Sequence, residues 1–72
     1  MNTDLKTLAT YLDTAHRVVM RAHATYTDAC DAGADPAYIS AAADLLADTS
    51  GDLADFLAGY IDAVVAAREQ AA

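Results

Sequence analysis

The chain has 72 residues, one cysteine and a formal net charge of −7 at pH 7. A chain this short makes one small domain, and a lone cysteine excludes an intramolecular disulfide that would stabilise it. The acidic balance excludes ordinary nucleic-acid binding and disfavours anionic membranes, because both present phosphate. We therefore expect residues 1–72 to form a single helical domain that gains stability by associating with another chain.

Composition and the N-terminal residues also indicate the source organism and the cellular compartment. Nineteen alanines, and ten aspartates against one glutamate, are typical of GC-rich coding sequences such as those of actinobacteria, their phages and halophiles. The start, MNTDLK, lacks the basic region and apolar segment of a signal peptide. Together with the lone cysteine, this predicts a cytoplasmic protein of a bacterium or phage that does not bind membranes.

The first predicted element is an amphipathic helix over about residues 3–32. Its apolar residues recur three and four positions apart through more than three heptads. Alanines on one side of this seam allow a neighbouring helix to approach closely. The seam consists of Leu5, Leu8, Leu12, Ala15, Val19, Ala22, Tyr26 and Ala29.

Glycine and proline mark the one clear break in the chain. Gly33 suits the left-handed position that ends many helices, and Asp35 and Pro36 suit the cap and first position of the next helix. A connection as short as residues 33–35 joins antiparallel neighbours. The break therefore predicts a helical hairpin.

The second helix is predicted over about residues 36–70. Its seam repeats the same spacing and consists of Ile39, Ala42, Leu46, Thr49, Leu53, Phe56, Tyr60, Ala63 and Ala67. Ser50 and Gly51 form a common kink site, and Thr49 with Asp52 resembles a weak capping box, so a break into three helices stays open. Because the heptad phase continues across this site, we expect a continuous or merely kinked helix.

Two helices alone leave many apolar residues off their seams. These are Tyr11, Val18 and Met20 in the first helix, and Tyr38, Leu45, Leu57, Ile61, Val64 and Val65 in the second. A second hairpin would cover them, so we expect an all-α homodimer that forms a four-helix bundle. The alternative is a groove kept open for a helix of another protein.

Four potential metal ligands share one side of the first helix, namely His16, Met20, His23 and Cys30. Imidazole and sulfur ligands suit copper or zinc. The two histidines are seven residues, or about 10.5 Å, apart along the axis, too far to bind one ion without a second helix or a dimer mate. We expect the flank of a helix with no cofactor, and a metal-binding bundle remains an alternative.

No pattern in the chain indicates an enzyme. Glycine-rich phosphate loops, a nucleophile elbow and the Glu-x-x-His pairs of di-iron bundles are all absent from the sequence. Cys30 is predicted near a helix C-terminus between Asp28 and Asp31, where negative potential disfavours a reactive thiolate. We therefore expect an inert, partly covered thiol.

The second helix carries the most distinctive feature, an acidic stripe. It consists of Asp48, Asp55, Asp62 and Glu69 at one heptad position, with Asp44 and Asp52 beside them. No lysine or arginine occurs between Arg21 and Arg68. The stripe is either a solvated surface that keeps an alanine-rich bundle soluble or a docking surface for a basic partner.

We predict a small, non-enzymatic protein-interaction or regulatory module that binds an unidentified protein of basic character. The partner-binding residues would be Asp44, Asp48, Asp52, Asp55 and Asp62 for charge, with Leu57, Ile61 and Val64 as apolar anchors. Arg17 and Arg21 would meet the carboxylates of the second helix across the dimer and set its register. The alternative is a phage-type acidic inhibitor that mimics nucleic acid and binds a DNA- or RNA-binding protein.

Overall fold

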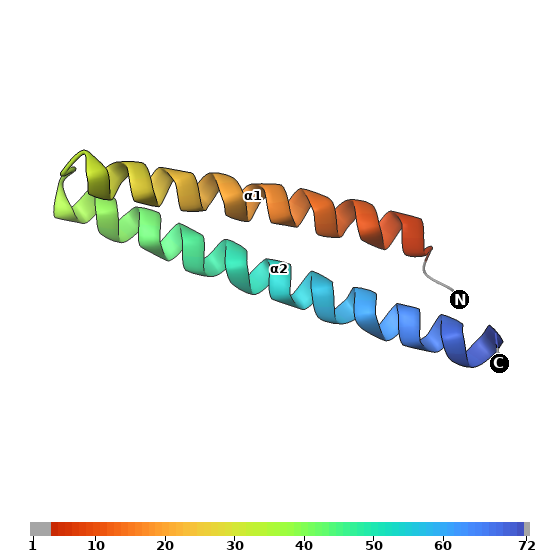
Figure 1. Ribbon diagram of the computed structural model, residues 1–72. Coiled ribbons are helices and arrows are strands. Elements are labelled where there is room, and N and C mark those ends of the chain that lie inside the picture. Colours follow the sequence, from red (N-terminus) through yellow and green to blue (C-terminus); the bar gives the residue numbers. More distant parts are fainter. Residues whose placement is uncertain (1–3, 72) are drawn as a thin grey trace.

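In the computed structural model, which describes residues 4–71, the chain folds into two long helices packed antiparallel (Figure 1). Helix α1 spans Leu5–Asp31 and helix α2 spans Pro36–Ala71. Within the described residues there are no strands. The prediction of an all-α helical hairpin is confirmed, although residue 3, where the first helix was expected to begin, lies outside the described part of the chain.

Local hydrogen bonds explain where α1 begins. Asp4 is its N-cap, and the Asp4 carboxylate accepts a hydrogen bond of 3.0 Å from the backbone N–H of Lys6. The Thr7 hydroxyl donates to the same carboxylate at 3.4 Å. The bond from Lys6 satisfies one of the backbone N–H donors that the first turn of a helix leaves without partners.

Gly33 ends α1 as the sequence predicts. Its φ of 64° lies in the left-handed region that favours glycine. The N–H of Ala34 donates to the Ala29 carbonyl at 3.0 Å, and the N–H of Gly33 donates to the Cys30 carbonyl at 3.2 Å. This pair of bonds is the Schellman arrangement, which closes a helix and redirects the chain.

Asp35 then begins α2. Its side chain accepts a hydrogen bond from the N–H of Ala37 at 3.3 Å, and its carbonyl accepts from Tyr38 and Ile39 at 2.9 and 3.0 Å. Pro36 occupies the first helical position, where a missing N–H costs nothing. Because Gly33 ends α1 and Asp35 and Pro36 begin α2, the connection between the helices is only a few residues long.

The helix α2 runs unbroken through Ser50 and Gly51. The Thr49 hydroxyl donates to the Leu45 carbonyl at 2.9 Å, one turn back in the same helix, and is not used as a cap. The question of two or three helices is therefore resolved in favour of two.

The two seams face each other, but they bury very little. Every seam residue of α1 is buried or half-buried, whereas Phe56 and Ala67 of the α2 seam are exposed. The buried apolar residues within the described chain are Ala22, Ala29 and Ala42, which are 4%, 5% and 7% exposed. All three lie toward the turn, and the helices diverge toward the other end in Figure 1.

The hairpin is elongated and open. Its dimensions are 55 × 17 × 14 Å and its radius of gyration is 16.5 Å, against about 11 Å for a compact chain of this length. It exposes 5310 Å², against roughly 4,250 Å² for a compact monomer of this mass. None of the described helices is long and apolar enough to cross a membrane.

Candidate functional site

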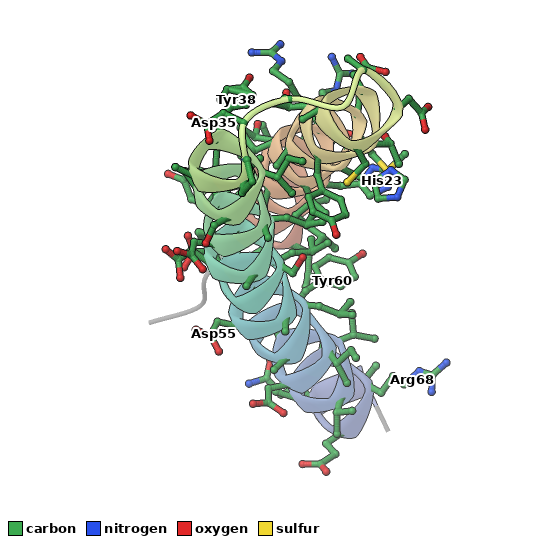
Figure 2. The ribbon with its side chains drawn as sticks, turned by 90° about the vertical axis from the view of Figure 1, so that its left-hand side faces the viewer. His23, Asp35, Tyr38, Asp55, Tyr60 and Arg68 are labelled. Atoms are coloured by element: carbon green, nitrogen blue, oxygen red, sulfur yellow. The ribbon has the colours of Figure 1, made fainter. Side chains whose placement is uncertain are left out.

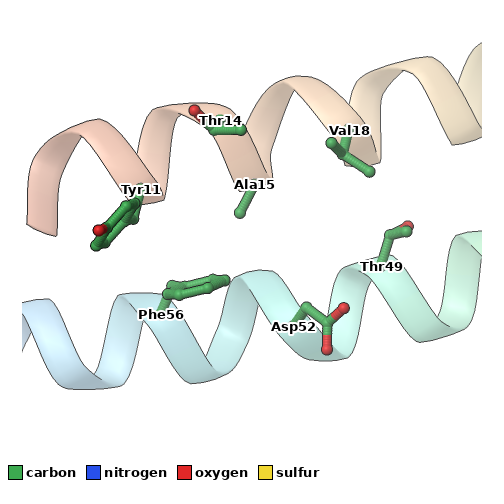
Figure 3. Close-up of a pocket in the computed structure, with 7 residues that line it drawn as sticks. All are labelled: Tyr11, Thr14, Ala15, Val18, Thr49, Asp52 and Phe56. Carbon is green, nitrogen blue, oxygen red and sulfur yellow. The ribbon is translucent and has the colours of Figure 1, made fainter.

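A hollow of about 230 Å³ opens on one side of the hairpin, between the two helices (Figure 3). It is lined by Tyr11, Thr14, Ala15, Val18, Thr49, Asp52 and Phe56. The rings of Tyr11 and Phe56 close one end with their centroids 6.4 Å apart and their planes tilted by 39°. The hollow exists because Ala15 and Thr49 are small and the helices have begun to diverge at this level.

We call this side of the hairpin the pocket face. It carries five large apolar side chains that are between 44% and 53% exposed, namely Tyr11, Val18, Tyr38, Leu45 and Phe56. The α2 members Tyr38 and Leu45 precede Asp52 by fourteen and seven residues, a spacing that returns to the same side of a helix. The pocket face is therefore an apolar strip that runs from the hollow toward the turn.

The opposite side, the histidine face, carries the predicted metal ligands. Figure 2 shows His23 and Tyr60 pointing away from the side occupied by Tyr38 and Asp55. His16 and Cys30 lie seven residues before and after His23, and so on the same side of α1. On α2 this face has the predicted apolar anchors Leu57, Ile61 and Val64; the first two are exposed and Val64 is half-buried.

The histidine face of a single hairpin does not assemble a metal site. Within residues 4–71, no three His, Cys, Asp or Glu side chains lie close enough together to hold an ion. His16, Met20 and His23 are exposed along α1. A metal-binding function would therefore need ligands from a second chain.

Cys30 is exposed, so the prediction of a partly covered thiol is wrong. Ala29 is buried between the helices at this level, and Cys30 is one residue further round α1, outside the contact. Its main neighbour is Tyr26 on the preceding turn. A hydrogen bond with Cys30, and then the negative charge of the thiolate, raise the pKa of the Tyr26 hydroxyl above its ordinary value.

The acidic stripe is straight and fully displayed, since α2 does not break. All six carboxylate residues of the stripe are exposed, and successive members of its main row are seven residues, or about 10.5 Å, apart along the axis. The ion pair within the described residues joins Arg17 to Asp13 at 3.0 Å, within α1. The stripe therefore has no positive partner in the described part of its own chain.

The structure divides the predicted partner-binding residues between two sides of α2. Asp44, Asp48, Asp52, Asp55 and Asp62 border or join the pocket face, where Asp52 lines the hollow. Leu57, Ile61 and Val64 lie roughly 100–160° around the helix axis from the main row of carboxylates, by the 100° turn of each helical residue. A single helix of a partner cannot contact both sets at once.

Sequence reasoning missed the hollow. The available signal was the off-seam pair Tyr11 and Val18, seven residues apart, next to the small seam residue Ala15. That pair indicates an apolar flank, but predicting a hollow also requires the distance between the two helices, which the sequence does not give.

No protein-family model, curated protein or solved structure matches this chain.

Proposed function

We propose that this protein is a non-enzymatic protein-interaction module. Its hairpins associate through exposed apolar side chains and present the acidic stripe of α2 to a basic protein partner. One observation carries this proposal: among residues 4–71, three alanines are buried, while nine large apolar side chains remain exposed. These nine are Tyr11, Val18, Met20, Tyr38, Leu45, Phe56, Leu57, Ile61 and Val65.

The imbalance between buried and exposed residues favours association. Fully burying one Val, Leu, Ile or Phe side chain contributes about 1.5–3 kcal/mol, whereas alanine offers little apolar area. The chain exposes roughly 1,000 Å² more than a compact monomer of 7.5 kDa would. That excess is close to the area of about 800 Å² that each partner contributes to a standard protein interface.

The acidic stripe supports a basic partner. Its carboxylates lie in a row and make no ion pair with an arginine or lysine within the described residues. Such a row attracts positive charge over a distance and accelerates encounter with a complementary surface. Phosphates on one DNA strand are spaced by about 3.4 Å, a third of the spacing within the main carboxylate row, so mimicry of nucleic acid is the less supported alternative.

Sedimentation equilibrium of the intact chain tests the self-association. We expect a species of twice the 7.5 kDa chain mass at low and high salt, over a wide range of concentrations. Apolar burial does not weaken as salt rises, so the dimer should persist. A monomer at every concentration would contradict self-association.

A synthetic lysine-rich helical peptide, labelled for fluorescence anisotropy, tests the stripe. The variant Asp48→Asn/Asp55→Asn/Asp62→Asn should bind it at least tenfold more weakly. The matched control Asp28→Asn/Asp31→Asn/Asp35→Asn removes the same charge from exposed residues around the turn. Equal loss in both variants would show that net charge alone attracts the peptide and would remove the stripe from the proposal.

A further inference from the structure

We propose that two copies of this chain pair through their pocket faces, with their turns at the same end of the bundle. In this arrangement α1 of each copy lies beside α2 of the other. The inference rests on the proposed self-association and specifies its face and its orientation.

The pocket face has the apolar content and the size that a dimer needs. It carries five of the nine exposed large apolar side chains, and the hollow gives a partner's side chains a place to enter. The outline of the hairpin, 55 × 17 Å or roughly 900 Å², is close to the 800 Å² per partner of a standard interface, and the apolar strip occupies its part from the hollow to the turn. The other four exposed large apolar side chains are Met20, Leu57 and Ile61 on the histidine face and Val65, one turn after Ile61 on α2.

The two edges of the pocket face differ in charge. On α1, Arg21 lies seven residues after Thr14, which lines the hollow, so Arg21 belongs to the same edge. On α2, Asp48 and Asp55 lie four residues before and three after Asp52, which also lines the hollow. Asp28 lies seven residues further along the same edge, so the α1 edge is neutral overall where the α2 edge is acidic.

This charge pattern selects one of two symmetric arrangements. Identical faces pair through a two-fold axis that lies in the interface, either along the helices or across them. An axis across the helices sets the acidic edge of each copy against the acidic edge of the other. An axis along the helices sets each acidic edge against the neutral α1 edge that carries Arg21, so the repulsion between acidic edges is relieved.

The register of the hairpin makes the contact specific. Tyr11 lies level with Phe56 along the hairpin axis, and Val18 lies level with Thr49 across the hollow. Each step of one residue forward along α1 is therefore matched by one step backward along α2. Arg21 is therefore level with Leu46 and about 3 Å along the axis from Asp48. A two-fold axis along the helices keeps these levels and places Arg21 beside Asp48 of the partner subunit.

The same register provides a partner for the one carboxylate that lines the hollow. Asp52 is level with Ala15, so its closest polar neighbour across the interface is Thr14 of the partner subunit. The Thr14 hydroxyl can donate a hydrogen bond to a carboxylate, which offsets part of the cost of removing Asp52 from water. The pair forms twice in the symmetric dimer.

Two leucines on opposite sides of α2 test the face. Leu45 is on the pocket face and Leu57 on the histidine face, and both are exposed in the hairpin. In sedimentation equilibrium, Leu45→Glu should raise the dimer Kd at least tenfold, while Leu57→Glu should leave it within twofold of the original. Circular dichroism checks the helices, and Leu45→Ala, which favours helix, is the second variant if Leu45→Glu unfolds.

Each outcome of this comparison has a distinct meaning. A dimer broken by Leu57→Glu and not by Leu45→Glu would overturn the pocket-face assignment and leave the proposed function standing. Equal weakening by both would contradict a dimer that uses one face. An original chain that is monomeric throughout would overturn both proposals.

The single cysteine tests the orientation. Cys30 is exposed, belongs to the histidine face and can carry a nitroxide label without entering the proposed interface. With turns together, electron–electron distance measurements should give a separation near the width of the bundle, about 20–25 Å from helix diameters. With turns apart, each label lies about 18 Å from the middle of α1, which adds roughly 36 Å along the axis and would overturn the orientation.

Discussion

The two halves of the hairpin differ in how their helices pack, with small residues in contact next to the turn and larger residues next to the chain ends. Near the turn, Ala22, Ala29 and Ala42 let the helices approach until all three are buried. In the other half the seams carry residues such as Leu8, Leu12 and Tyr60, and the helices diverge (Figure 1). Close approach of small residues buries little area, and large residues at a wider spacing stay half exposed. Neither half makes a core that suffices alone.

Enlarging a side chain in the close half should have the largest effect. Ala22→Leu must push the helices apart at their nearest contact and should lower the free energy of unfolding by about 1–3 kcal/mol. The control Ala24→Leu places the same side chain on an exposed position of α1 and should change it by less than about 0.5 kcal/mol. Urea unfolding at one fixed protein concentration measures both. An unchanged or raised value for Ala22→Leu would show that the close half is not tightly packed.

The turn that holds the close half together should be the next most sensitive point. Gly33→Ala forces a side chain into the left-handed region and should cost about 1–2 kcal/mol. Gly51→Ala makes the same change inside α2, where nothing lies within 4 Å of the added carbon, and should stabilise the helix by up to about 1 kcal/mol. Thermal unfolding of the two variants should shift in opposite directions. A shift of the same sign in both would contradict either the turn geometry or the continuity of α2.

The smallest expected effect concerns charge at the edge of the pocket face. Arg21→Gln should raise the dimer Kd about two- to fivefold, the range of an exposed ion pair. Arg17→Gln removes the same charge from a guanidinium that already pairs with Asp13 at 3.0 Å, and should change Kd less. Sedimentation equilibrium at low salt compares the two. A larger effect at Arg17 would contradict the proposed contact between Arg21 and Asp48 of the partner subunit.

Most of the fold could be predicted because its signals are local. The apolar seam follows from the period of a helix, and the break follows from the backbone preference of Gly33 and the capping by Asp35. The continuity of α2 was predicted from the heptad phase, which carries across Ser50 and Gly51, although the local sequence at this step also permitted a break. Local patterns therefore predict where each helix begins and ends, but they do not decide between alternatives that depend on packing against another segment.

The surfaces were harder to predict than the fold. The separation of Leu57 and Ile61 from the carboxylate row follows from 100° per residue and was available from the sequence alone. The hollow was not, because it depends on the spacing between two helices as well as on the size of Ala15 and Thr49. The exposure of Cys30 depends likewise on the angle at which α1 meets α2.

The first turn of α1 and the last turn of α2 lie at the same end of the hairpin (Figure 1). In a pair with turns together, both copies would bring these ends to one pole and both loops to the other. A label or carrier protein fused to either end would then emerge at a single pole, with both long sides of the bundle left clear. The pair could be tethered to a surface from that pole while the stripe residues outside the interface, such as Asp62 and Glu69, faced the solution.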